Sequence, residues 1–304
     1  FYGHWQYLDL HLLKADYLKS IALLHSQPPL WNALLGAILN AVDGSEQEFL
    51  RAYSFFSFLI SLCTALLVFF TLVRLKTTRI MALAASSVYI TASSAYFYEV
   101  YIFYPLFTAF LAAAFFSSLA YAFSSRKDAI RIALSTLSCI CLILLSVTWT
   151  LFHPVFVIAT SWIIVWRAFV PRGTEANEPK PKTQWFALFT IGILLSLATV
   201  IVPLKNKVLY DHFGSGSWIG MNLSQVAPGS SKTCGFGPLT NYEINSSQEL
   251  TRFTKTSSHP SINSLAKNGG DVNHNHVGYI VRSKSCRPEA SKLIANNLLP
   301  FAKA

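Results

Sequence analysis

Five long windows without a charged residue constrain the fold of this chain more than any other feature of its sequence. A helix needs about 20 apolar residues to cross the hydrocarbon core of a membrane, so a window of this kind is long enough to span. The uncharged windows are 52–73, 80–98, 100–125, 132–166 and 183–204. The fourth is long enough for two helices, which the polar break from Thr150 to Pro154 would separate. The sequence therefore predicts six spans, at 52–73, 80–98, 103–123, 132–150, 154–170 and 184–204.

The composition agrees with an all-α membrane protein. Of the 304 residues, 53% are hydrophobic and only 12% are charged, and the mean hydropathy is +0.42. These values exclude an ordinary soluble domain. The chain opens neither with Met nor with a signal peptide, so we expect a fragment that lacks its beginning.

The formal net charge of +10 raises the question of nucleic-acid binding, which the placement of the charges answers. Lys and Arg fill alternate connections between the predicted spans: they occur at 74–79, 126–131 and 167–182 and are missing from 99–102 and 151–153. This alternation is typical of membrane topology, with the basic connections in the cytoplasm. No nucleic-acid partner is expected.

Because six is an even number, both ends of the chain are expected in the outer compartment. We expect an outer loop at 1–49 with amphipathic and short surface helices, a transmembrane bundle at 50–204, and a loop-rich extracytoplasmic segment at 205–304.

The outer loop contains two candidate surface helices. Leu10, Leu13, Tyr17, Ile21 and Leu24 recur at spacings of three and four, as in an interfacial amphipathic helix. The apolar run 30–42 has 13 residues and would be about 20 Å long, too short to span. The preceding proline pair suits the first positions of that helix and keeps the residues before it extended. We therefore expect His25 and Gln27 at the membrane surface.

Several polar residues on the predicted outer face are candidates for chemistry, because ionisable groups at a membrane edge are costly. Glu99 stands alone between two uncharged windows, and His153 lies at the break between two spans. Asp9 is an outer carboxylate close to aromatic residues. Lys205 follows the last span on the face where the positive-inside bias disfavours lysine, which favours an anionic partner such as a lipid phosphate. Each also has a simpler reading, as a solvated loop charge, a polar helix stop or a helix anchor.

Two further features of the tail allow alternatives. Cys234 and Cys286 could form a disulfide if the tail lies outside the cytosol. The NHNH run at 273–276 allows a zinc reading, but no supporting ligand lies at a suitable spacing. A solvated loop is the expected structure there, and no metal site is predicted.

Four motifs in order give the chain a resemblance to a known family. LHSQPPLWN at 24–32, YEVYIFYP at 98–105, LFHP at 151–154 and SWIGMNL at 217–223 resemble a family-39-like branch of the GT-C class of membrane glycosyltransferases. This superfamily includes protein O-mannosyltransferases and the lipid A aminoarabinose transferase. The resemblance implies transfer of a sugar from a polyprenyl-phosphate donor to a glycan, lipid or protein acceptor on the outer face, with inversion.

The resemblance also implies roles for individual residues. The catalytic general base would be Asp9 or Glu99, the donor phosphate would be bound by His25, His153 and Lys205, and the sugar and lipid site would be shaped by Gln27, Trp31 and Trp218. Family members carry their acidic signature after a first spanning helix, which leaves a further place for the base upstream of Phe1. No cofactor beyond the donor substrate is implied with certainty, and the resemblance leaves a divalent metal open.

Two other classes of protein remain alternatives. A transporter would carry charges or broken helices near the middle of its spans, which these windows do not show. A non-catalytic membrane scaffold would tolerate loss of the candidate residues. The expected location is a multi-pass protein of a bacterial plasma membrane rather than of the endoplasmic reticulum.

Overall fold

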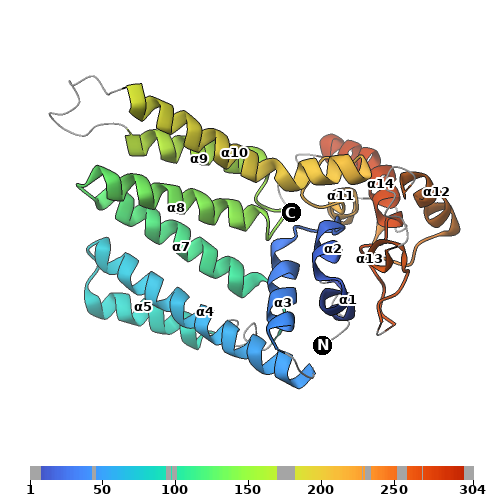
Figure 1. Cartoon of the computed structure of the whole chain (residues 1–304), viewed down its shortest axis with the longest axis horizontal. Coiled ribbons are helices and arrows are strands. Elements are labelled where there is room, and N and C mark those ends of the chain that lie inside the picture. Colours follow the sequence, from blue (N-terminus) through green and yellow to red (C-terminus); the bar gives the residue numbers. More distant parts are fainter. Residues whose placement is uncertain are drawn as a thin grey trace. The chain divides into compact units, whose positions relative to one another are not determined.

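The computed structural model is all-helical, as the sequence predicts (Figure 1). The structure describes residues 8–42, 46–93, 97, 101–169, 182–227, 229, 234–251, 259–268 and 270–297. This part of the chain contains no β-strand, and its only β-type pairing is an isolated antiparallel bridge between Ala266 and Val272. The chain divides into two compact units. The first unit combines residues 1–41 with 202–304, and the second comprises 42–201.

The second unit is a bundle of apolar helices. Its helices are α4 (Glu46–Arg74), α5 (Arg79–Thr91), α7 (Pro105–Ser124), α8 (Asp128–Ser146), α9 (Pro154–Phe169) and the first part of α10 (Lys182–Tyr210). Among the described residues, four helices are long and apolar enough to cross a membrane: α4, α7, α8 and residues 185–210 of α10. Helices α5 and α9, which correspond to two predicted spans, have 13 and 16 residues and fall below this length.

Side-chain contacts give the direction of the first three helices of the bundle. Tyr53 near the start of α4 donates to the carbonyl of Tyr101, which lies before α7. Thr71 and Ser117 near the ends of the same helices share a hydrogen bond of 2.6 Å between their hydroxyl groups. Helices α4 and α7 therefore run parallel, and the chain between them, which contains α5, returns to the end where α4 began.

Helices α8 and α9 run antiparallel. The Arg131 guanidinium at the start of α8 donates to the carbonyl of Ala168 at the end of α9, 2.8 Å away. Further along, the thiol of Cys139 contacts the carbonyl of Ser161. The apolar core of the bundle is centred on these helices and includes Leu142, Val157 and Leu188. Helix α9 therefore runs along most of α8, although it is short.

The first unit begins with three short helices. Helices α1 (Leu10–Ala15) and α2 (Tyr17–Ala22) replace the single amphipathic helix that the spacing predicts. The break lies at Asp16, whose backbone is not helical and whose carboxylate contacts the ring of His259, 3.1 Å away. The break in the helix thus coincides with a tertiary contact of Asp16. The short helix after the prolines forms as expected, as α3 (Leu30–Ala41), and the carbonyl of Pro29 accepts its first backbone hydrogen bond.

The C-terminal segment is more helical than expected. It contains α11 (Ile219–Val226), α12 (Asn241–Thr251), α13 (Pro260–Asn263) and α14 (Gly278–Asn296). A capping box starts α12: the backbone N–H of Thr240 donates to the Glu243 carboxylate, and the Thr240 hydroxyl accepts from the backbone N–H of Glu243. A search for hydrophobic periodicity does not detect a capping box, because its residues are polar.

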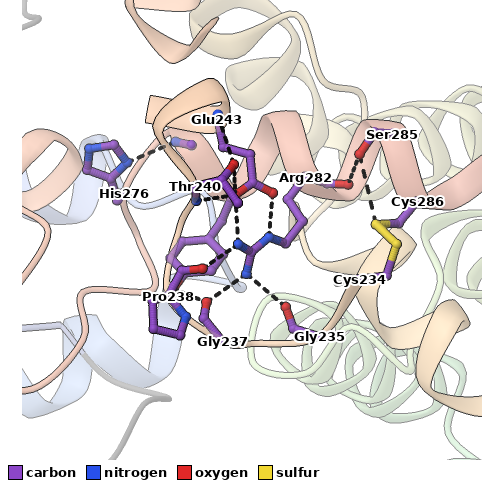
Figure 2. Close-up of polar contacts among 12 residues, drawn as sticks. Cys234, Gly235, Gly237, Pro238, Thr240, Glu243, His276, Arg282, Ser285 and Cys286 are labelled. Carbon is purple, nitrogen blue, oxygen red and sulfur yellow. Dashed lines mark hydrogen bonds and ion pairs between the residues drawn. A yellow bond between two sulfur atoms is a disulfide. The ribbon is translucent and has the colours of Figure 1, made fainter. Parts of the chain in front are cut away.

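A buried arginine holds this segment together (Figure 2). Arg282 in α14 uses all five N–H groups, two on the Glu243 carboxylate at 2.6 and 2.7 Å and three on the carbonyls of Gly235, Gly237 and Pro238. A disulfide between Cys234 and Cys286 joins the same loop to α14, so the pairing that the sequence left open is present in the structure. The loop before α12 is thus fixed to α14 by charge and by a covalent bond.

We predict that Gly220→Ala destabilises the protein. A β-carbon at position 220 would overlap the backbone carbonyl of Ser283, where α11 and α14 approach closely, and neither backbone can yield easily. Overpacking of this kind costs about 1–3 kcal/mol. The apparent melting temperature in detergent should fall for Gly220→Ala and stay near the wild-type value for Gly237→Ala, where a β-carbon meets no atom within 4 Å. Equal effects of the two substitutions would contradict the close helix contact.

We also predict that Glu243→Gln destabilises the first unit strongly. Burial by itself would raise the pKa of Glu243, but hydrogen bonds from Arg282 and Thr240 outweigh it and lower the pKa. The carboxylate therefore stabilises the fold above its unfolded pKa, and this contribution is lost as the pH falls through the folded pKa. Glu243→Gln leaves the buried Arg282 charge unpaired, at a cost of about 3–5 kcal/mol. Thermal unfolding should detect this loss, whereas Glu289→Gln, on the exposed side of α14, should leave the melting temperature unchanged.

Candidate functional site

His25 lies in the turn between α2 and α3 and is completely buried (0% exposed). Proline has no backbone N–H, and it disfavours helical conformation in the residue before it, so Pro28 and Pro29 separate the turn from α3. The turn therefore belongs to neither helix, and its backbone polar groups need partners elsewhere. The structure places His25 in the interior of the first unit, and its expected position at the membrane surface stays a prediction.

Asn275 supplies partners for the backbone of this turn. Its side-chain oxygen Oδ1 accepts the backbone N–H groups of His25 and Ser26, at 3.0 and 3.1 Å. Its Nδ2 donates to the carbonyl of Ser261 at 3.1 Å and lies 3.5 Å from the carbonyl of Leu23. One buried amide thus connects the 23–26 turn to the segment before α14.

The NHNH run that contains Asn275 is buried, so the expectation of a solvated loop was wrong. All four side chains of residues 273–276 are at most 8% exposed. Asn273 donates to the carbonyls of Ser261 and Ser264, and the ring of His274 packs 5.0 Å from that of Tyr279. Burial lowers the pKa of His274 to about 4. In the described part of the chain, no group of three or more His, Cys, Asp or Glu side chains is placed to hold a metal ion.

Two hydrogen bonds fix His25 against Ser217. The backbone N–H of Ser217 donates to the carbonyl of His25 at 2.8 Å, and the Ser217 hydroxyl lies 2.9 Å from His25 Nδ1. The ring of Tyr210 meets the imidazole edge to face, at 4.8 Å between ring centres. Nε2 is buried and has no hydrogen-bond partner among the described residues. Burial, with a contribution from the nearby Lys205 charge, lowers the pKa of His25 to about 3, so the ring is neutral at pH 7.

Lys205 lies beside this histidine. It is half-buried in the last part of α10, and its Nζ donates to the carbonyl of Leu24, the residue before His25. The structure therefore brings together two of the three residues assigned to a phosphate from sequence.

Asp9 belongs to the same unit, but its hydrogen bonds go elsewhere. It is the N-cap of α1, and its Oδ1 accepts the backbone N–H of His11 at 3.0 Å. Its Oδ2 accepts the backbone N–H of Asn268 at 2.7 Å. Lys267, next to Asn268, is close enough to interact electrostatically with Asp9. Asp9 therefore has a structural role at the start of α1, whatever its chemical role.

The three residues expected to shape the substrate site also lie in the first unit. Trp218 is buried next to Ser217, and its indole N–H donates to the carbonyl of His274 at 3.3 Å. Trp31 is buried in α3, and Gln27 is half-buried in the turn. Trp218 is thus adjacent in the chain to a residue that touches His25.

The other two predicted site residues lie in the sequence range of the second unit. Glu99 falls outside the described residues. His153 is exposed, and its Nδ1 accepts the backbone N–H of Val155 at 3.3 Å, in the first turn of α9. This bond matches the simpler reading of His153 as a polar residue at a helix end.

Sequence reasoning missed Asn275, Ser217 and Tyr210. Each contacts the 23–26 turn from a distance of 187 to 250 residues along the chain, so no local pattern links them to His25. Ser217 and Asn275 did lie within runs that were noticed, SWIGMNL and NHNH, but for other reasons.

Comparison of the chain with protein-family models, with curated proteins and with solved structures found no match.

We predict that His25 makes the fold sensitive to acid. The pKa of His25 in the folded protein is about 3, below the ordinary value of 6.5. At a pH between these two values, the ring is neutral in the folded protein and binds a proton when the protein unfolds. The free energy of unfolding should therefore be highest above pH 6.5 and fall by about 1.4 kcal/mol per pH unit below it. Buried His212, His274 and His276 act in the same direction.

The measurement is the melting temperature of the protein in detergent between pH 7 and pH 5. His25→Gln should reduce the pH dependence, whereas the exposed His153→Gln should leave it at the wild-type slope. A wild-type slope for His25→Gln would contradict the buried neutral ring.

Proposed function

We propose that the protein is an integral membrane glycosyltransferase of the GT-C type. It would transfer a sugar from a polyprenyl-phosphate donor to a glycan, lipid or protein acceptor on the extracytoplasmic face, with inversion at the anomeric carbon. The observation that carries the proposal is the contact between the Lys205 and His25 segments at the end of the apolar helix α10. A cation beside a buried polar turn at this position suits the phosphate of a membrane-held donor.

The two side chains can serve the leaving group in different ways. Lys205 supplies a positive charge. Its ammonium group has three N–H donors, one of which bonds to the carbonyl of Leu24. His25 is neutral, and its buried Nε2 has no partner in the described part of the chain, so a phosphate oxygen that reached it could accept a hydrogen bond there. A fixed charge in a partly buried site interacts with a phosphate more strongly than it would in water. Together these groups favour a phosphate over a neutral ligand.

In the proposed reaction, a hydroxyl oxygen of the acceptor bonds to the anomeric carbon while the bond from that carbon to the phosphate oxygen breaks. The phosphate leaves with the bonding electrons, and a carboxylate general base takes the acceptor proton. Asp9 and Glu99 are the candidate bases in this chain. Asp9 keeps lone pairs beyond the two backbone hydrogen bonds that it accepts, and it is only half-buried. Positioning donor and acceptor together would make the step effectively intramolecular.

The proposal includes six membrane crossings with both chain ends in the outer compartment. The parallel course of α4 and α7 supports a return of the chain through α5, and the antiparallel course of α8 and α9 supports a crossing by α9. Both helices are shorter than a typical span, about 20 and 24 Å at 1.5 Å per residue. The disulfide is typical of a segment outside the cytosol, and a bacterial plasma membrane is the proposed location.

A transporter and a scaffold remain the alternative classes. The polar cluster of His25, Ser217 and Asn275 lies outside the uncharged windows, which favours chemistry at a surface over passage through the bundle. A scaffold would bind its partner without any donor, so an assay for transfer separates it from the proposed enzyme.

We predict that Lys205→Ala raises the KM for the donor by about 10- to 100-fold, because a charged hydrogen bond to phosphate contributes about 1.5–3 kcal/mol. The assay uses the full-length protein in native membranes, which supply acceptors, with a labelled polyprenyl-phosphate hexose or pentose. The matched control is Lys207→Ala. Lys207 lies on the same helix, is exposed and pairs with Asp211.

His25→Ala should also weaken donor use, and Asp9→Asn or Glu99→Gln should lower kcat with little change in the donor KM. Wild-type rates for His25→Ala, Asp9→Asn and Glu99→Gln together would remove the proposed site. Absence of both transfer and polyprenyl-phosphate binding in the wild-type protein would overturn the function itself.

A further inference from the structure

We propose that Ser217 is a positioning residue that holds His25 in the tautomer with its hydrogen on Nε2, so that the buried ring is a fixed hydrogen-bond donor. The tautomer follows from the geometry of the two side chains. The identity of the acceptor, a phosphate oxygen of the donor lipid, rests on the proposed function.

The two possible tautomers differ in how many buried groups they leave without a partner. If Nδ1 carried the hydrogen, it would donate to the Ser217 hydroxyl oxygen, 2.9 Å away. The hydroxyl hydrogen would then need another acceptor, and the structure gives this buried hydroxyl no second hydrogen bond within the described residues. The lone pair on Nε2 would also remain without a donor. This tautomer leaves two groups unsatisfied.

The other tautomer leaves only one. The Ser217 hydroxyl donates to Nδ1, which uses its hydrogen, and only the N–H at Nε2 remains unpaired in the described part of the chain. An unsatisfied buried polar group costs about 1–3 kcal/mol, so the difference of one group favours hydrogen on Nε2. The remaining N–H is buried, and a ligand oxygen that reached it would give the last polar group of the ring a partner.

Backbone hydrogen bonds hold His25 next to Ser217. Ser217 N–H is bound to the His25 carbonyl at 2.8 Å, so the hydroxyl and the ring are held at a fixed separation. Asn275 holds the His25 backbone N–H from the other side, and the Tyr210 ring packs against the imidazole. The Tyr210 hydroxyl is itself committed to the carbonyl of Leu23, at 2.7 Å. These contacts hold the backbone of His25 and Ser217 together and support the ring in its position beside the Ser217 hydroxyl.

Lys205 gives this donor a preference for an anion. Its ammonium group contacts the carbonyl of the preceding residue, Leu24, and acts electrostatically on the His25 ring. A neutral N–H donor next to a single cation suits an acceptor with negative charge, such as a phosphodiester oxygen. A ring that carried its hydrogen on Nδ1 would present a lone pair at Nε2 and would repel the same oxygen.

The test is nitrogen NMR of the full-length chain with 15N-labelled histidine in detergent, without donor. We expect a pyridine-type nitrogen at Nδ1 of His25 and a pyrrole-type nitrogen at Nε2. The signal is assigned by its loss in His25→Gln or, if this variant does not fold, by removing the other seven of the eight histidines one at a time. A pyrrole-type Nδ1 in the wild-type protein would overturn the inference.

In Ser217→Ala, we expect His25 to exist as a mixture of its two neutral tautomers. Binding of a polyprenyl phosphate probe should weaken by about tenfold, the effect of one hydrogen bond. The matched control is Ser224→Ala, which removes another buried hydroxyl of the same unit, one bound to the carbonyls of Met221 and Cys234. Equal spectra and equal affinities for the two variants would show that Ser217 does not position the ring.

The two proposals can fail separately. A pyridine-type Nδ1 that depends on Ser217, together with no transfer and no binding of polyprenyl phosphate by the wild-type chain, would remove the glycosyltransferase and leave the fixed donor. Transfer activity with the opposite tautomer would remove only the role of Ser217.

Discussion

The side chain of Asn275 is the contact on which the candidate site depends. The turn at 23–26 lies between two helices and is buried, so its backbone groups cannot turn to water. A single amide from the segment before α14 accepts two of its N–H groups and donates to Ser261. The position of His25, and with it the closeness of Lys205, follows from this amide. The residues that hold the site together are therefore mostly uncharged, and the charge is confined to Lys205.

Many buried polar groups are satisfied within their own part of the fold. In the bundle, serine and threonine hydroxyls pair between helices, as Ser118 and Ser138 do at 2.8 Å. In the C-terminal segment, Arg282 is paired with a carboxylate and three carbonyls. Nε2 of His25 is one of several buried side-chain atoms that have no partner among the described residues, and it shares this state with Asn32 Nδ2 and Asn206 Oδ1 in the same unit.

The sequence predicted what depends on local pattern. The uncharged windows indicated the long apolar helices, and the proline pair indicated where α3 begins. It also selected His25, because the proline pair constrains the backbone of its segment, and Lys205, because the positive-inside bias disfavours lysine on the predicted outer face. It did not predict that α1 and α2 separate at Asp16, whose carboxylate contacts His259, far away in the chain. The burial of the NHNH run was missed for the same reason: its asparagines bind distant backbone groups, and their polarity suggested solvent. A count of apolar residues does not locate helix ends, and α5 and α9 have only 13 and 16 residues.

The disulfide has a consequence for how the C-terminal segment would respond to a protease. Cys234 and Cys286 are 52 residues apart, and the ring that they close contains α12, α13 and the NHNH run. A single cut of the peptide backbone anywhere inside that ring opens the loop but leaves both fragments covalently attached. Asn275 and Ser217 would then remain in one molecule after nicking, and only a reducing agent would separate the fragments on a gel.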